Sequence, residues 1–136
     1  MPPTLIVDDS RTMRRMVIAS LRDVCAGGFV EAASGLEAIE RLAVVPIAMV
    51  VLDLNMPDMH GIDVLKFVRR HHAFGELPVI VLTTRGDDAS RAAALAAGAS
   101  AYLTKPFDPR ELAEHARALL TASQRVVTSR DANGER

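Results

Sequence analysis

The 136-residue chain has one cysteine, few aromatic residues and no excess of charge of either sign. The single cysteine, Cys25, cannot form a disulfide within the chain. The 16 basic and 17 acidic residues give a formal net charge of −1. A chain so balanced has no overall positive field with which to hold a phosphate backbone, so we expect no binding of nucleic acid through global charge.

Long hydrophobic runs are missing too. The longest apolar stretch, residues 42–52, is interrupted by Pro46 and is far shorter than the ~20 residues of a membrane-spanning helix. Met1 is followed almost at once by an apolar run, without the basic region or the small-residue cleavage site of a secretory signal. Together with the single cysteine, these absences predict a cytoplasmic protein that is not bound to a membrane.

The chain does show short apolar runs that alternate with segments of helical periodicity. We expect strands at residues 5–7, 29–30, 47–52, 79–82 and 101–103. Apolar residues recur at helical spacing in the intervals that follow, over residues 13–24, 36–43, 62–68, 89–97 and 112–120. This strict alternation predicts an α/β fold, a single doubly wound (βα)5 sandwich around a five-stranded parallel sheet.

The helical pattern ends near residue 122. Residues 123–136 have no apolar face to bury, and we interpret them as a disordered C-terminal tail after a domain that covers residues 1–122. A domain of about 120 residues fills nearly all of the chain. We therefore expect no covalently attached effector domain.

Polar side chains follow four of the five expected strands. Asp8 and Asp9 follow the first strand, Asp53 the third, Thr83 the fourth and Lys105 the fifth. Each has an ordinary explanation when it is taken alone, such as a helix cap, a solvated turn residue or a surface lysine. The carboxyl ends of parallel strands share one edge of the sheet, however, so we expect these residues to converge there.

Such a cluster has a definite chemistry. Three carboxylates at close range repel one another unless a cation lies among them, and oxygen ligands of this kind favour a hard ion such as Mg²⁺. Magnesium is typically bound by one or two carboxylates and by phosphate oxygens, which leaves one acid free to react. The cluster therefore predicts phosphoryl transfer to Asp53, with Thr83 and Lys105 stabilising the charge of the phosphoryl group.

With these residues in place, the sequence resembles the receiver domain of two-component response regulators over most of residues 3–122. It is most similar to the single-domain chemotaxis regulators of the CheY type. The motifs that carry the resemblance are Asp-Ser-Arg-Thr-Met-Arg-Arg at 9–15, Asp-Leu-Asn-Met-Pro at 53–57 and Lys-Pro-Phe at 105–107. The resemblance implies a flavodoxin-like sheet with the strand order 2-1-3-4-5.

The resemblance also assigns roles at the site. It makes Asp53 the phosphoacceptor and lets Thr83 and Lys105 contact the phosphoryl group. It implies a magnesium site formed by Asp8, Asp9, Asp53 and the backbone carbonyl of Asn55.

Two further features are implied in the same way. The Lys105–Pro106 peptide bond is expected to be cis. Tyr102 falls at an aromatic switch position, where the ring turns inward as Thr83 moves toward the phosphate. That movement remodels the face formed by the fourth helix, the fifth strand and the fifth helix, and a downstream protein is expected to bind there.

The resulting prediction is a stand-alone response regulator that acts in chemotaxis. It accepts a phosphoryl group from a histidine kinase or a histidine phosphotransfer protein, and it is a monomer when unphosphorylated. It is not an enzyme, apart from its own phosphorylation and dephosphorylation at Asp53. One alternative is a phosphorelay intermediate that passes the phosphate onward to a histidine phosphotransfer protein.

Two more distant alternatives fit the residues less well. A haloacid-dehalogenase-like phosphatase needs a second acid two residues after its nucleophile, where this chain has Asn55, which cannot donate and recover a proton. A flavodoxin-like cofactor binder would place a phosphate beside Asp8 and Asp9, which would repel it. Residues 69–72 form a basic cluster that we interpret as a solvated helix end.

Overall fold

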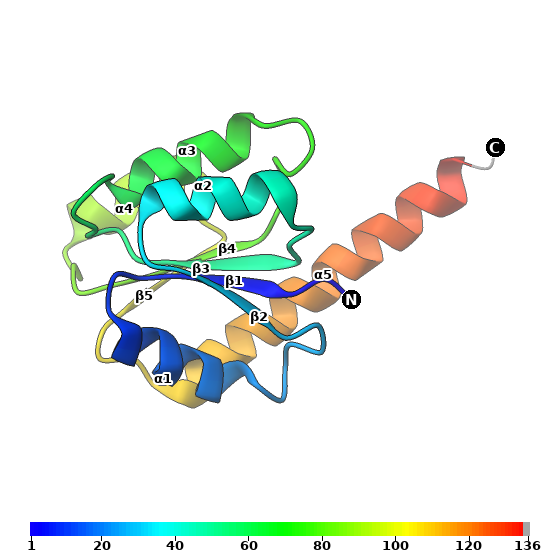
Figure 1. Cartoon of the computed structure of the whole chain (residues 1–136). Helices are drawn as coiled ribbons and strands as arrows, with labels where there is room; N and C mark the ends of the chain where they lie inside the picture. The colour runs from blue at the N-terminus through cyan, green and yellow to red at the C-terminus, as the bar shows by residue number, and fades with distance from the viewer. Residues whose placement is uncertain (135–136) are drawn as a thin grey trace.

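The computed structural model describes the backbone of residues 1–134 and the side chains of residues 1–123. Five strands alternate with five helices along the chain, and the strands form one parallel sheet in the order β2-β1-β3-β4-β5 (Figure 1). The predicted α/β fold and its strand order are therefore confirmed. The elements are β1 Thr4–Val7, α1 Arg11–Leu21, β2 Phe29–Ala32, α2 Gly35–Val44, β3 Met49–Leu52, α3 Gly61–Arg70, β4 Val79–Thr83, α4 Asp88–Ala96, β5 Ala101–Thr104 and α5 Pro109–Gly134.

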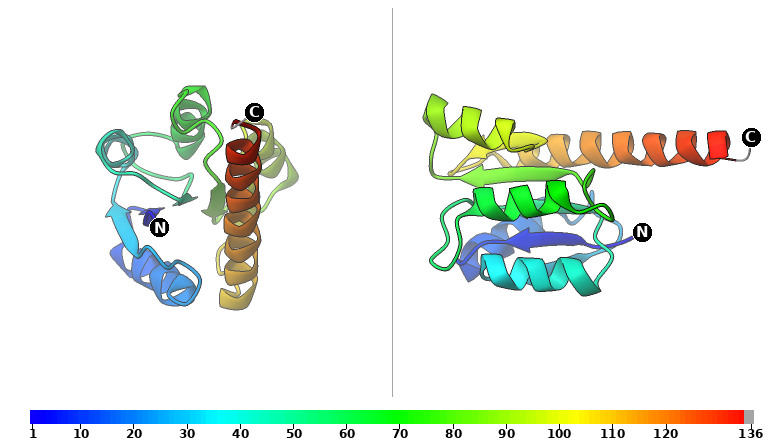
Figure 2. Two further views of the ribbon diagram at one scale, coloured as in Figure 1. Left: turned by 90° about the vertical axis from the view of Figure 1, so that its right-hand side faces the viewer. Right: turned by 90° about the horizontal axis from the view of Figure 1, so that it is seen from above.

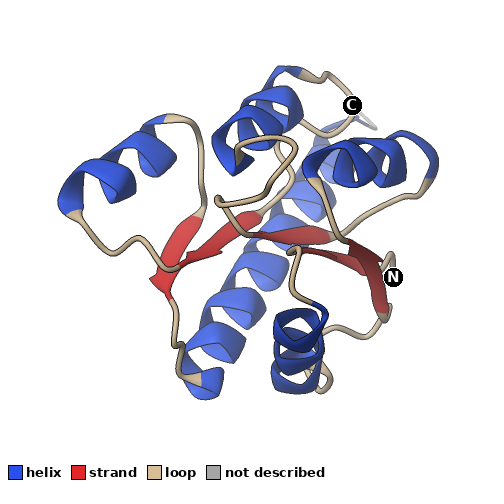
Figure 3. Cartoon of the chain, turned by 60° about the vertical axis from the view of Figure 1, so that its left-hand side comes forward, coloured by secondary structure: helices blue, strands red, loops and turns tan. Residues whose placement is uncertain are grey.

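Helices cover both faces of the sheet. Helices α2, α3 and α4 lie on one face, and α1 and α5 lie on the other (Figures 1 and 3). Alternate residues of one strand serve the two layers: Leu5 and Val7 belong to the core under α2, α3 and α4, whereas Ile6 belongs to the core under α1 and α5. Because both faces are buried, the central strand β3 is apolar at every position, although it begins at Met49, two residues later than the expected strand at 47–52.

Side chains at the helix starts tie the loops of one sheet edge together. Ser34 is the N-cap of α2 and accepts a hydrogen bond from the Glu37 amide. Asp58, from the loop between β3 and α3, accepts two more hydrogen bonds, from the Leu36 amide at 3.0 Å and the Gly35 amide at 3.1 Å. These bonds hold the pKa of Asp58 below its usual value, and they fix the loop that follows β3 against α2.

Helix α5 extends farther than expected. We predicted a disordered tail over residues 123–136, but the helix continues to Gly134, and its C-terminal part projects beyond the sheet (Figure 2). Between Pro109 and Gly134 the sequence has neither proline nor glycine, so no residue type that stops a helix interrupts it. Residues 135–136, and the side chains from residue 124 onward, are outside the part of the chain that the structure describes. The domain boundary at residue 122 stays a prediction.

The basic cluster at the end of α3 is not uniformly solvated. Arg70 and His72 are exposed as expected, but Arg69 is half-buried. Its guanidinium donates hydrogen bonds to the backbone carbonyls of Gly98 at 2.7 and 2.9 Å, Leu77 at 2.6 Å and Gly75 at 3.1 Å. The interpretation of this residue as solvated was wrong because the α4–β5 loop covers the end of α3. No helix among the described residues is long and apolar enough to cross a membrane.

Candidate functional site

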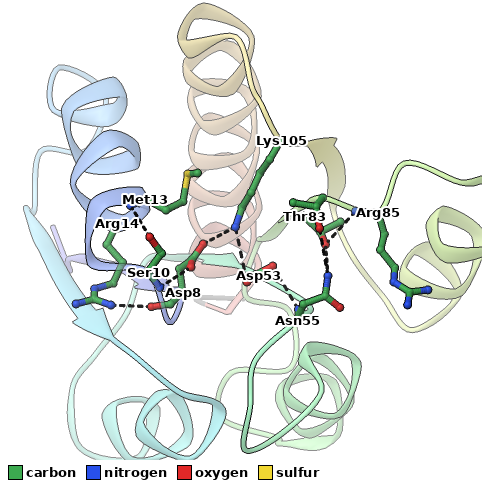
Figure 4. A network of polar contacts seen from close by, with 10 residues as sticks. Asp8, Ser10, Met13, Arg14, Asp53, Asn55, Thr83, Arg85 and Lys105 are labelled. Carbon is green, nitrogen blue, oxygen red and sulfur yellow. Dashed lines mark hydrogen bonds and ion pairs between the residues drawn. The ribbon is translucent and has the colours of Figure 1, made fainter.

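The candidate site lies where the strands end, at their carboxyl edge. Backbone hydrogen bonds continue the sheet ladder one residue past three of the strands. The Asp8 amide donates to the Ala32 carbonyl at 3.1 Å, the Asp53 amide to the Val7 carbonyl at 2.9 Å, and the Lys105 amide to the Thr83 carbonyl at 2.8 Å. The functional side chains are therefore held in the register of the sheet rather than in free loops (Figure 4).

Three carboxylates meet at this edge. Asp8, Asp9 and Asp53 each offer one oxygen atom, and these atoms lie within 4.8 Å of one another. Asp8 and Asp53 are buried, whereas Asp9 is exposed. The predicted convergence of these three acids is confirmed.

Lys105 supplies the positive charge of the cluster. Its ammonium group lies 2.6 Å from Oδ2 of Asp8 and 3.6 Å from Oδ2 of Asp53, and its side chain is only 11% exposed. A lysine so enclosed is not an ordinary surface residue. The Lys105–Pro106 peptide bond is cis, as the resemblance implied.

The surroundings raise the pKa of Asp53. Burial is the largest cause, and Lys105 opposes it by favouring the ionised form. The neighbouring carboxylate of Asp8 raises the pKa further, the Asn55 amide lowers it, and Asp9 raises it. Asp53 is therefore a carboxylate whose negative charge is not fully compensated by the protein.

The donor set fits a hard divalent cation. Three carboxylates and one ammonium group leave two net negative charges, which one divalent ion would neutralise. All the candidate ligand atoms are oxygens, and no sulfur or imidazole takes part in the cluster, which favours magnesium-like ions over zinc. Residues Asp8, Asp9 and Asp53 would hold the ion.

Asn55 and Thr83 form the other side of the site. The Asn55 amide donates to Oδ1 of Asp53 at 3.3 Å, and its side-chain Nδ2 lies 3.4 Å from the hydroxyls of both Thr83 and Thr84. Thr83 is fully buried and also accepts a bond from the Arg85 amide at 3.4 Å. These contacts link Thr83 to Asp53 through Asn55. The role of the Asn55 carbonyl as a metal ligand stays a prediction.

Tyr102 connects the loop that follows β4 to the edge strand β5. The side chain is buried, and its hydroxyl donates a hydrogen bond to the backbone carbonyl of Arg85, two residues after Thr83. The guanidinium of Arg91, on α4, lies 5.8 Å from the centre of the ring. The ring is therefore turned inward in this structure, and its role as a switch stays a prediction.

Gly61 allows α3 to start directly behind the site. Its amide donates to the Leu54 carbonyl at 2.9 Å. A Cβ atom at this position would lie 2.4 Å from the Asp53 carbonyl oxygen and 2.6 Å from the Leu54 Cα, both on the backbone. Only glycine fits at this point without moving the segment that carries Asp53.

Sequence reasoning missed two residues that hold Asp8. The Ser10 amide donates to Oδ1 of Asp8 at 2.9 Å. Arg14 donates from Nη1 to the Asp8 backbone carbonyl at 2.7 Å and from Nε to Glu31 at 2.9 Å. The available signal was an arginine one turn into the helix that follows the acids, but nothing in the sequence indicates that it reaches a main-chain carbonyl.

Comparisons with known proteins agree with this site. Residues 4–117 match the protein family described as the response regulator receiver domain. The chemotaxis protein CheY1 of Helicobacter pylori is 41% identical over 117 residues, which cover 85% of this chain and 94% of that protein. The CheY homologue of Campylobacter jejuni is 38% identical over 111 residues, covering 81% and 85%.

A solved structure shows the same fold at a similar level of identity. The chemotaxis response regulator CheY4 of Vibrio cholerae is 33% identical to this chain, and the two folds superpose with a TM-score of 0.78. The match covers 88% of this chain and 98% of that one. The chain thus shares both its fold and much of its sequence with chemotaxis regulators.

Proposed function

The chain belongs to the receiver-domain family of response regulators, and from this premise we propose that it is a phosphorylation-controlled switch with Asp53 as its phosphoacceptor. It is a regulator rather than a classical enzyme, and its acidic pocket is a metal site of the kind typical of receiver domains. A receiver domain implies a histidine kinase as the partner. The observation that carries the proposal is a buried carboxylate, Asp53, beside two other acids and one lysine.

The proposed reaction moves one phosphoryl group. An oxygen of Asp53 attacks the phosphorus of a phosphohistidine, and the bond between phosphorus and the imidazole nitrogen breaks. The electron pair of that bond stays on the imidazole, which takes up a proton, and Asp53 becomes an aspartyl phosphate. Hydrolysis of the aspartyl phosphate by water returns the carboxylate and releases inorganic phosphate.

The residues around Asp53 prepare this transfer. The Asn55 amide holds one carboxylate oxygen of Asp53, and Lys105 lies 3.6 Å from the other. The Lys105 ammonium and the Thr83 hydroxyl are the donors available for the phosphoryl oxygens. Magnesium, held by Asp8, Asp9, Asp53 and the Asn55 carbonyl, would supply positive charge for the phosphate oxygens when it is bound.

The switch is proposed to run from Thr83 to Tyr102. Thr83 begins the β4–α4 loop, and two residues later the Arg85 carbonyl accepts the Tyr102 hydroxyl. A movement of Thr83 toward a phosphoryl group would therefore shift the same loop that holds the tyrosine. The face formed by α4, β5 and α5 borders this ring and is the proposed docking surface for a downstream protein.

Chemotaxis is the pathway that the relatives favour, because the similar proteins from Helicobacter and Campylobacter are named chemotaxis proteins. We propose that the chain acts as a stand-alone regulator in the cytoplasm and is monomeric when unphosphorylated. A phosphorelay intermediate is the main alternative. The two differ in the fate of the phosphate, which an intermediate would transfer to a purified histidine phosphotransfer protein.

A phosphatase of the haloacid-dehalogenase type is disfavoured. The position two residues after Asp53 carries Asn55, whose amide nitrogen faces Thr83 and Thr84 rather than a substrate. An amide cannot act as a general acid near neutral pH. Such an enzyme would also have no use for Asp8 and Asp9 together.

Intact mass spectrometry tests the proposed function directly. Incubation with Mg²⁺ and a small phosphodonor such as acetyl phosphate is expected to add one acid-labile phosphoryl group to the wild type. D53N should take up none, while D23N, which changes an exposed aspartate away from the site, should be labelled like the wild type. Absence of label on the wild type, or equal labelling of D53N, would rule out Asp53 as the acceptor.

A further inference from the structure

We propose that Arg14 is a positioning residue for the metal-binding acids, acting through the peptide bond that joins Asp8 to Asp9. The inference rests on the proposed magnesium-dependent function of the site. Arg14 touches neither the candidate ligand atoms nor Asp53. Its effect would come from the main chain, because its Nη1 donates to the carbonyl of Asp8 at 2.7 Å.

Arg14 is well placed for such a role. Its guanidinium is a rigid planar fork that holds two acceptors on different elements, the Asp8 carbonyl after β1 and Glu31 on β2. The Arg14 side chain is 13% exposed, although it carries a charge. A half-buried arginine with two hydrogen-bond acceptors is fixed in position, so it can in turn fix the carbonyl that it contacts (Figure 4).

The two acids differ in how they are held. The Asp8 carboxylate has a hydrogen-bond donor on each oxygen, the Ser10 backbone amide at 2.9 Å and the Lys105 ammonium at 2.6 Å. Asp9 has no hydrogen bond or ion pair of its own among the interactions of the described residues. The main chain, which sets the point and the direction from which its side chain starts, is therefore the part of Asp9 that other residues can hold.

The relevant piece of backbone is the peptide plane between these residues. The Asp8 carbonyl belongs to this rigid plane, whose orientation is defined by ψ of Asp8 and φ of Asp9. Holding the carbonyl oxygen restricts both angles, and with them the direction in which the Asp9 side chain leaves the main chain. Arg14 thereby orients the one candidate carboxylate ligand that has no hydrogen bond or ion pair of its own among the described residues.

The ion pair with Glu31 makes it possible to distinguish two effects of Arg14 on cation binding, the positioning of Asp9 and the charge of the guanidinium. Its carboxylate lies 2.9 Å from Nε of Arg14 and balances the guanidinium. If Arg14 acted only through its charge, its removal would leave Glu31 unpaired and make the site more negative, which would strengthen the binding of a cation. If Arg14 acts by positioning, its removal must weaken cation binding in spite of that added negative charge.

The experiment measures Mg²⁺ binding by isothermal titration calorimetry on the full chain, with no phosphodonor present. The variants are R14A, the charge-balanced double variant R14A/E31A, and R15A, which changes the exposed arginine next in sequence. We expect R14A and the double variant to bind Mg²⁺ about tenfold more weakly, which is typical for the loss of an outer contact of a metal site. R15A should bind like the wild type.

A conservative variant separates positioning from stability. R14K keeps a donor for the Asp8 carbonyl but loses the fork, and we expect its Mg²⁺ affinity to lie between those of R14A and the wild type. Circular dichroism at increasing temperature without metal shows whether each variant folds. If R14A does not fold, the Mg²⁺ affinity of R14K is measured instead. An R14K affinity equal to that of the wild type would then overturn the proposal.

The outcomes distinguish a failure of the proposed magnesium-dependent function from a failure of the proposed role of Arg14. A wild type that binds no Mg²⁺ would refute the magnesium-dependent function itself. A wild type that binds Mg²⁺ while R14A and R14A/E31A bind it equally well, or more tightly, would overturn only the role of Arg14. A lowered melting temperature with unchanged Mg²⁺ affinity would show a purely structural residue and would also overturn the proposal.

Discussion

Asp53 is buried beside two other carboxylates, and this has a consequence for the metal-free protein. Burial raises its pKa, and although Lys105 opposes the shift, it does not cancel it. An acid whose pKa is raised in the folded state favours folding in its protonated form. That contribution is fully present below the ordinary pKa of an aspartate and is lost as the pH rises through the raised value. At neutral pH without metal, the Asp53 charge therefore disfavours the folded state.

We accordingly predict that D53N is more stable than the wild type at neutral pH in the presence of a chelator. The difference should shrink as the pH falls through the acidic range, because the wild-type carboxyl becomes neutral there. Urea denaturation followed by circular dichroism at several pH values measures this difference. D23N should show no such gain, and a D53N protein less stable than the wild type at neutral pH would contradict the prediction.

At the scale of elements, the Arg69 side chain connects the end of α3 to two neighbouring loops. Arg69 donates to carbonyls in the α3–β4 loop and to the Gly98 carbonyl in the α4–β5 loop. Removing the guanidinium would leave these half-buried carbonyls without their donor, and burial already lowers the pKa of this arginine.

We predict that R69M lowers the free energy of unfolding by about 3 kcal/mol, since several hydrogen bonds to a charged donor are lost together. The matched control is R70M, because Arg70 is adjacent and exposed. Its effect should stay within about 0.5 kcal/mol, as for most surface substitutions. Chemical denaturation measures the free energy of unfolding of both variants. Equal values for R69M and R70M would refute a connecting role for Arg69.

The β4–α4 loop and β5 meet at Tyr102, which is the one tyrosine of a chain that has no tryptophan. Its emission therefore reports on this position alone. If occupation of the site draws Thr83 toward the phosphoryl group, the inward position of the ring should become more populated. Acrylamide should then quench the tyrosine less efficiently.

We predict a lower quenching constant after addition of Mg²⁺ and beryllofluoride, a stable mimic of the phosphoryl group. In D53N the same addition should leave the quenching constant unchanged. Steady-state fluorescence titrations with acrylamide measure both proteins. An identical quenching constant in the wild type before and after the addition would argue against coupling between the site and Tyr102.

For the molecule as a whole, the sequence was informative wherever structure follows from local pattern. The existence of β3, though not its first residue, and the acids after the strands were predictable, because apolar runs and topology place them without knowledge of the packing. Arg14 and Arg69 were not, because each acts on main-chain carbonyls brought near by the tertiary fold. The length of α5 was not predictable from an apolar face, because residues 123–133 have none, although they also contain no proline or glycine that would stop a helix.

The boundary at residue 122 gives a prediction for the whole chain. Among the side chains that the structure describes, which end at residue 123, the buried residues of α5 are Leu112, Ala116 and Leu120, all before that boundary. We expect residues 1–122 to fold with a stability within about 1 kcal/mol of the full chain, since the core contacts of α5 are retained. They should also accept a phosphoryl group at the same rate. Thermal melting and mass spectrometry test this, and a truncated chain that does not fold would move the boundary into the helix.

The direction of the first and last elements has a practical consequence. Strand β1 runs toward the candidate site, whereas α5 runs away from it, so both ends of the chain emerge at the edge opposite to Asp53 (Figures 1 and 2). A fluorescent protein or an affinity handle attached at either terminus would leave the acidic pocket open to a docking kinase. The domain is thus suited to live-cell reporters and to immobilised binding assays without redesign of its scaffold.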